Sequence, residues 1–266
     1  MPYGDGGIFS LGLHNCKKWR SIDDLIQPLN AMMAEFRFRV FVLPSLTLLS
    51  FEDAKQEFPE YCHLHYEVRE GKWDKNYYSV HADGGLTLRF EIPFFQSTSQ
   101  PLRDHMLMSS SIFGEEYNKI VFSSTLGTRH LDSERINKYQ GLLMNLYSQI
   151  SLFLIPFLSP DYVSILEDDE KNDEFVQANQ VLQKQVKYIY WANYFGSEYL
   201  SKGEQKIFNA APAGKVNSFG DGLWYYLHED FEALTDEEMF STERIAMDYF
   251  SQYFDLKWVQ WRFSPA

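Results

Sequence analysis

Cysteine is almost absent from this chain, since Cys16 and Cys62 are the only two in 266 residues. Two cysteines cannot form a disulfide framework, and their scarcity is typical of proteins from a reducing compartment. Neither stands in a recognisable nucleophile motif, and a cysteine nucleophile would also need a general base and an oxyanion site. The sequence therefore argues against a disulfide-stapled secreted domain and against covalent cysteine catalysis.

Basic residues are also scarce, because 24 Lys and Arg face 37 Asp and Glu and the formal net charge is −13. Such a chain lacks the cationic surface that nucleic acids and anionic membranes require. The acidity is uneven: residues 1–150 hold 15 basic and 18 acidic side chains, whereas residues 151–266 hold 9 and 19. A basic partner would complement the acidic half, and the alternative is that acidity only keeps the protein in solution.

The sequence shows neither a leader nor a long run free of polar groups. Residues 1–13 have no basic region followed by an apolar stretch, so we predict no signal peptide and a cytoplasmic protein. Residues 141–160 carry no charge but include Asn145, Gln149 and Pro156, and such polar groups are costly in lipid. We therefore expect a core helix and no membrane partner, with buried side chains at Leu143, Leu146, Ile150 and Phe153.

No nucleotide-binding motif is present, since no glycine-rich loop is followed by Lys-Ser or Lys-Thr. The densest group of potential metal ligands follows Cys62. There His63 and His65 would share one face of a strand, and His81 could supply a third ligand. No paired ligand set at a known spacing accompanies them. Structural or surface histidines are therefore the preferred interpretation, and no metal, cofactor or catalytic residue is predicted.

Helical and strand patterns alternate along the chain without a regular βαβ order. This mixture indicates an α+β fold with a mixed, mainly antiparallel sheet or sheets and packed helices. The length suits one domain over 1–266 or two closely packed halves, 1–130 and 131–266. Helices are predicted from 21, 132, 175 and 235 and over 101–117, a hairpin over 215–228, and strands at 36–43, 61–69, 76–82, 86–92, 119–123, 162–166 and 258–263.

An acidic stretch near the C-terminus, 229–240, is interleaved with apolar residues. Acidic side chains around apolar anchors are what an interface against a basic protein would use. An ordinary helix start is the alternative, because acids favour the positive helix N-terminus. The residues predicted to bind a partner are Glu229, Asp230, Phe231, Glu232, Asp236, Glu237, Glu238 and Phe240. The apolar face predicted for the helix that follows comprises Ala246, Tyr249, Phe250, Tyr253 and Phe254.

The segment from Trp191 to Tyr199 is followed by Ala210-Ala211-Pro212-Ala213 and then by Gly220-Asp221-Gly222. Over residues 132–228, this order resembles the C-terminal part of bacterial immunity proteins of type VI secretion and polymorphic toxin systems. Those proteins often carry an aromatic-Phe-Gly-Pro step, a short helix, a small-residue-Pro step and a hairpin, and Ser197 takes the place of the first proline. The resemblance implies a protein that neutralises a cognate toxin by binding it. It transfers no site residues, because such families place their contacts on variable surfaces.

The first hypothesis is therefore a binding protein that is not an enzyme, an immunity protein with a basic protein partner and no nucleic-acid partner. The second is an enzyme with an unconventional site built from His63, His65 and His81. The third is a structural or phage-borne interaction protein. A neighbouring toxin gene would favour the first, bound metal the second, and a stable homo-oligomer without a ligand the third.

Overall fold

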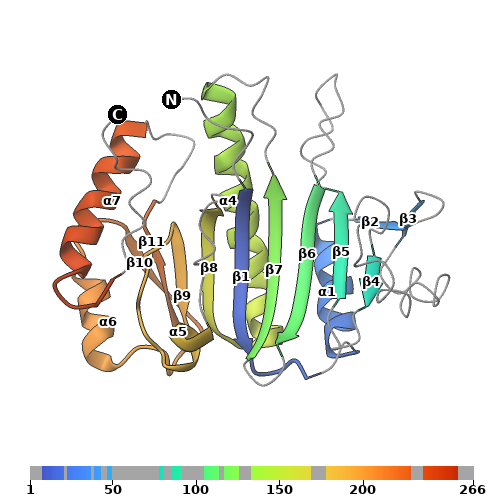
Figure 1. Cartoon of the computed structure of the whole chain (residues 1–266), viewed down its shortest axis with the longest axis horizontal. Helices are drawn as coiled ribbons and strands as arrows, with labels where there is room; N and C mark the ends of the chain where they lie inside the picture. Colours follow the sequence, from blue (N-terminus) through green and yellow to red (C-terminus); the bar gives the residue numbers. More distant parts are fainter. Residues whose placement is uncertain are drawn as a thin grey trace.

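One sheet runs through the structure, which is a computed structural model (Figure 1). The structure describes residues 8–20, 23–36, 39–42, 47–49, 78–80, 86–91, 105–113, 117–125, 133–168, 178–228 and 236–256. The strands are β1 (Ile8–Cys16), β2 (Arg39–Val42), β3 (Thr47–Leu49), β4 (Tyr78–Val80), β5 (Leu86–Glu91), β6 (His105–Phe113), β7 (Tyr117–Thr125), β8 (Pro160–Asp168), β9 (Ala192–Phe195), β10 (Lys215–Phe219) and β11 (Gly222–Tyr226).

The strands lie side by side in the order β10-β11-β9-β8-β1-β7-β6-β5-β2-β3, and β4 pairs with β5. Every pairing among the described strands is antiparallel. The helices are α1 (Asp23–Phe36), α4 (Ser133–Leu158), α5 (Ala178–Leu182), α6 (Lys202–Asn209) and α7 (Asp236–Phe250). The predicted α+β class with a mainly antiparallel sheet is confirmed.

The strand β1 lies between β7 and β8. Its residues Phe9, Leu11 and Leu13 share one face, because side chains alternate along a strand, and none is more than 1% exposed. Leu11 is in register with Phe122 of β7 and Ile165 of β8, which are also buried. No strand was predicted for this segment, although its alternation of apolar and small or polar residues was a signal that could have found it.

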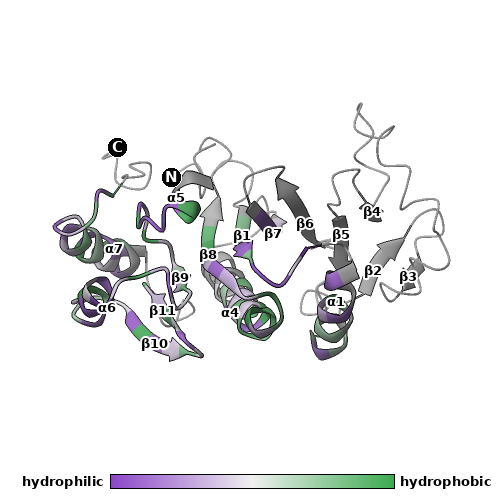
Figure 2. Cartoon of the chain, turned by 90° about the horizontal axis from the view of Figure 1, so that it is seen from below, coloured by the Kyte–Doolittle hydropathy of each residue, from purple (hydrophilic) through white to green (hydrophobic). Residues whose placement is uncertain are grey.

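The helices are divided between the two faces of the sheet. Figure 2 shows α1 and α4 on one side and α5 on the other, while α6 and α7 lie beyond the β9–β11 end. The first core lies between the sheet and α1 with α4, and it includes Trp19, Leu29, Tyr147 and Ile165. The second lies between the β8–β9–β11 end and α5, α6 and α7. The sheet thus separates two apolar clusters.

The long helix α4 fills the first core. The predicted burial of Leu143, Leu146 and Ile150 is confirmed, and the partly buried Phe153 packs edge-on against Phe36 with ring centroids 5.9 Å apart. By length and composition the window Gly141–Leu158 could also cross a membrane, with a mean hydropathy of 1.5, and 56% of it is buried within the fold. The helix continues through Pro156 and ends at Leu158, two residues before Pro160.

The helix predicted over 101–117 is wrong, because residues His105–Phe113 form the strand β6. This strand pairs with β5 on one side and β7 on the other. Its centre, Ser109–Ser111, has low helix propensity, and pairing on both edges decides its conformation. Of the elements beside the C-terminal hairpin, β9 was not predicted, and α6 was expected only as the short helix that the family resemblance implies. The strands predicted at 61–69 and 258–263 lie outside the described residues.

Candidate functional site

The residues predicted to bind a partner lie at the start of α7, as far as they are described. Glu237 and Glu238 are exposed and Phe240 is half-buried, while Asp236 is the first residue of the helix. Acids in the first turn also complement the positive end of the helix, so these positions fit both a helix start and an exposed acidic surface. The others, Glu229, Asp230, Phe231 and Glu232, lie outside the described residues.

The helix α7 is held firmly against the body of the protein. Phe250 and Ala246 are fully buried in the second core, and Phe250 contacts Phe208 of α6 with ring centroids 4.7 Å apart. Next to this core, Nε2 of His228 lies 3.3 Å from Oε1 of Glu243, and both side chains are buried. The exposed residues of α7 are therefore presented by a fixed element.

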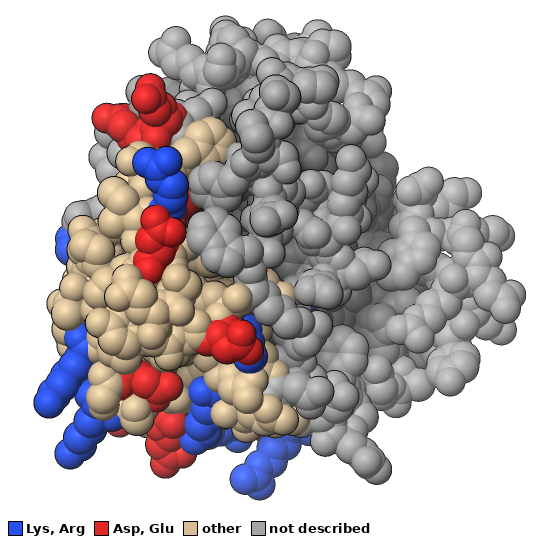
Figure 3. Space-filling model, turned by 60° about the vertical axis from the view of Figure 1, so that its left-hand side comes forward, with Lys and Arg blue, Asp and Glu red and all other residues tan. Residues whose placement is uncertain are grey.

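The acidity of the C-terminal half is concentrated rather than spread. Residues 178–228 contain five lysines and three acidic residues, whereas residues 236–256 contain six acidic residues and a single arginine. Figure 3, which looks onto this end, shows acidic side chains gathered towards the top and Lys and Arg interspersed with acids towards the bottom. Of these two stretches, it is α7 and the turn after it that offer an acidic surface for a basic partner.

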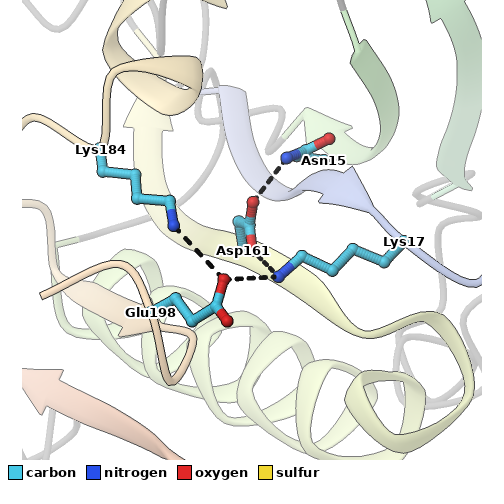
Figure 4. A network of polar contacts seen from close by, with 5 residues as sticks. All are labelled: Asn15, Lys17, Asp161, Lys184 and Glu198. Atoms are coloured by element: carbon cyan, nitrogen blue, oxygen red, sulfur yellow. Dashed lines mark hydrogen bonds and ion pairs between the residues drawn. The ribbon is translucent and has the colours of Figure 1, made fainter.

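A network of polar side chains joins β1, β8 and the segment after β9 (Figure 4). Asp161 is 5% exposed and accepts hydrogen bonds from Nδ2 of Asn15 at 2.5 Å and from Nζ of Lys17 at 2.7 Å. Glu198 lies 3.8 Å from Lys17 and 3.5 Å from Lys184. The hydrogen bond to Asp161 raises the pKa of Lys17. Each charge here faces a charge of opposite sign, and the arrangement links the end of β1, the start of β8, the segment after α5 and the segment after β9.

The neighbouring residues complete the C-terminal end of α4. The backbone amides of Lys17 and Lys18 donate to the carbonyl oxygens of Ser159 and Leu158, and Nζ of Lys18 donates to the Pro156 oxygen at 2.8 Å. Carbonyls at a helix C-terminus lack partners within the helix and favour cations. The lysines of this segment therefore have a structural explanation.

A histidine–serine pair is buried in the middle of the sheet. Nε2 of His14 lies 3.2 Å from Oγ of Ser164, and each residue is 1% exposed. Burial, together with the charge of Lys119, lowers the pKa of His14 well below its ordinary value, so the imidazole is neutral. A serine nucleophile activated by a histidine must reach its substrate, and this pair is closed off from solvent. Its role is structural.

The segment that carries the family resemblance also has a structural explanation. Asn193 is fully buried, accepts a hydrogen bond from the Tyr162 hydroxyl at 2.9 Å and donates one to the Tyr190 carbonyl oxygen at 2.9 Å. A Cβ on Gly196 would lie 3.1 Å from the Pro160 oxygen, so glycine permits the close approach of β9 to β8. The short helix and hairpin implied by the resemblance are α6 and β10–β11.

The histidines considered as metal ligands, His63, His65 and His81, lie outside the described residues, as does Cys62. Within the described ranges, no group of three or more His, Cys, Asp or Glu side chains is placed to hold a metal ion. Cys16 is buried, and burial raises the pKa of its thiol, which disfavours the reactive thiolate. The described residues thus contain no arrangement with evident catalytic chemistry.

No protein-family profile matches the chain, and no curated protein matches it. A solved structure described as the Pseudomonas aeruginosa T6SS protein PA0821 is similar over 94% of this chain and 74% of its own, with 11% sequence identity and a TM-score of 0.47. The function therefore has to be inferred from the residues of this chain.

Proposed function

We propose that this chain is an immunity protein that neutralises a cognate bacterial toxin in the cytoplasm by binding it directly. The toxin is a basic protein, and it contacts the acidic C-terminal end of the chain. The observation that carries this proposal is the charge of residues 236–256, which hold six acidic side chains and one arginine. Opposite potentials accelerate encounter and disfavour wrong partners.

Two further observations support a binding role over catalysis. The polar clusters within the described residues, around Asp161 and around His14, are either matched in charge or closed to solvent. The order of elements from β9 through α6 to the β10–β11 hairpin is the order that the resemblance to immunity proteins implies. An immunity protein needs no chemistry of its own, because occupying the toxin is sufficient.

The proposal is tested by finding the partner and measuring what binding does to it. The tagged chain captures proteins from its source cells at low salt, and mass spectrometry identifies them. Each candidate is then expressed in a heterologous bacterial host with and without this chain. We expect one basic protein that stops growth alone and is tolerated when co-expressed. A purified candidate that binds but is harmless, or that still stops growth in the presence of this chain, contradicts the proposal.

A further inference from the structure

We propose that the toxin contacts the solvent-facing side of α7 and the turn after it, with Ile245 and Tyr253 as the apolar anchors. This rests on the proposed function and adds two apolar anchors that were not among the predicted partner-binding residues. Ile245 is 44% exposed and Tyr253 is 52% exposed. Leu182 on α5 is the other large apolar residue of the described ranges with comparable exposure. Single exposed apolar residues are ordinary on a surface, so the inference depends on how these two are arranged.

Ile245, Tyr249 and Tyr253 follow one another at intervals of four residues, which places them as neighbours along one side of a helix and its terminal turn. The ring centroids of Tyr249 and Tyr253 are 5.3 Å apart. Tyr249 is fixed in turn, because its hydroxyl donates to the Ile207 carbonyl oxygen of α6 at 2.9 Å. The Tyr253 ring therefore packs against a side chain that is already held, which lowers the entropy lost when a partner orders it.

The helix that carries Ile245 is acidic on its exposed side. Glu237, Glu238 and Asp248 are exposed, and Arg244 is the one basic residue of 236–256. Asp255, next to Tyr253, is also exposed and forms an ion pair with Lys187, whose Nζ lies 2.7 Å from its Oδ2. Apolar anchors at the centre with charged residues around them are the usual anatomy of a protein interface. The complementary surface on a partner is a basic one with an apolar recess.

Charge also decides between the possible occupants of this side of α7. A second copy of the chain, related by a two-fold axis, would set the same acidic patch against itself, and like charges across an interface are unfavourable. An anionic membrane surface is disfavoured for the same reason. A basic protein is the occupant that the charges favour.

A site-specific photo-crosslinker tests this surface in the source cells. A benzophenone amino acid is placed at position 245, at 253, or at 218 as a control, because Ser218 is exposed on the edge strand β10 rather than on α7. We expect the basic protein identified by the pull-down to be crosslinked from 245 and 253 and not from 218. An adduct of two copies of this chain, or crosslinking from 218 alone, overturns the inference.

The affinities of the purified pair separate this inference from the proposed function. Ile245→Ala and Tyr253→Ala should each raise Kd about tenfold, as interface anchors do, while Ser218→Ala should leave it unchanged. All three changes are at exposed positions, so their melting temperatures should match that of the wild type. If the partner binds all variants equally, the contact surface is elsewhere and the proposed function stands. If no purified protein binds the wild type, both are wrong.

Discussion

Gly12 allows a histidine to lie across the middle of the sheet. A Cβ at this position would lie 2.4 Å from Nε2 of His14 and 3.2 Å from Oγ of Ser164. Gly12→Ala should therefore push the buried ring away from Ser164 and lower the free energy of unfolding by about 1–3 kcal/mol, the cost of unsatisfied buried polar groups. Urea unfolding measures the change.

Gly203→Ala is a matched control, because Gly203 is exposed in α6 and the nearest atom to its Cβ would be 3.8 Å away. Alanine favours a helix over glycine, so this variant should be as stable as the wild type or up to about 1 kcal/mol more stable. Equal stability of Gly12→Ala and the wild type would mean that the His14 ring has room to move.

His14 should also make stability depend on pH. Its pKa is well below 6.5 in the folded protein because it is buried and near Lys119, whereas the unfolded chain takes up a proton near the ordinary value. Protonation therefore favours unfolding as pH falls below 6.5. Between about pH 7.5 and pH 5.5 this single group should remove about 1 kcal/mol of stability.

The measurement compares urea unfolding of the wild type with that of His14→Gln at the two pH values. The variant cannot titrate at this position, so its loss of stability on acidification should be smaller by about 1 kcal/mol. Equal losses in both proteins would show that His14 does not change its protonation on unfolding.

Tyr253 was predicted on the apolar face of the last helix, but its side chain is exposed. The sequence assigned it to the apolar face that includes Ala246 and Phe250, and those two are buried. Tyr253 is 52% exposed instead, because the regular helix ends at Phe250 and the chain then turns. The sequence pattern does not state at which residue the regular helix ends, so the exposure of Tyr253 was not predicted.

At the scale of elements, α4 determines the first core. Leu146 is 3% exposed beneath the sheet, so Leu146→Asp places an unpaired charge in an apolar cluster. We expect a loss of at least about 3 kcal/mol, enough to unfold a protein of ordinary stability. Circular dichroism and urea unfolding detect it.

Gln149→Asp on the exposed side of α4 is the control, because it introduces the same charge at a solvated position. It should change stability by no more than about 0.5 kcal/mol. The assignment of α4 to a core would be contradicted if Leu146→Asp remained folded, or if the wild-type protein required detergent for extraction from membranes.

The helix α4 was predicted well because its apolar positions repeat at helical spacing over 26 residues, and that signal is local. The helix predicted over 101–117 is wrong because the partners that decide the conformation of β6, the strands β5 and β7, are separate segments that its own sequence does not reveal. The α+β class and the β10–β11 hairpin came from patterns within single segments. The order of strands in the sheet depends on long-range contacts, which no single segment encodes.

At the scale of the whole molecule, the net charge of −13 is unevenly distributed, and neighbouring segments can carry net charges of opposite sign. The acidity lies in the second half of the sequence, and residues 178–228, which are rich in lysine, contact the acidic α7 and the turn after it, as the ion pair between Lys187 and Asp255 shows. Glu237 and Glu238 could be predicted as exposed acids, because a run of charges at a helix start is normally solvated. Which apolar residues lie beside them depends on how α7 packs against α6, and the sequence does not state that.

The most direct test of the account is the rate at which the purified basic partner associates with charge-reversed variants. Glu237→Lys combined with Glu238→Lys is compared with Glu35→Lys combined with Asp221→Lys, which makes the same total change at exposed acids outside α7. The α7 variant should associate roughly tenfold more slowly at low salt, and the difference should shrink as salt rises, because rim charges act mainly on the association rate. Thermal melts must first show that both variants fold. Equal association rates and equal salt dependence for the two variants would contradict the claim that this acidic end meets the partner.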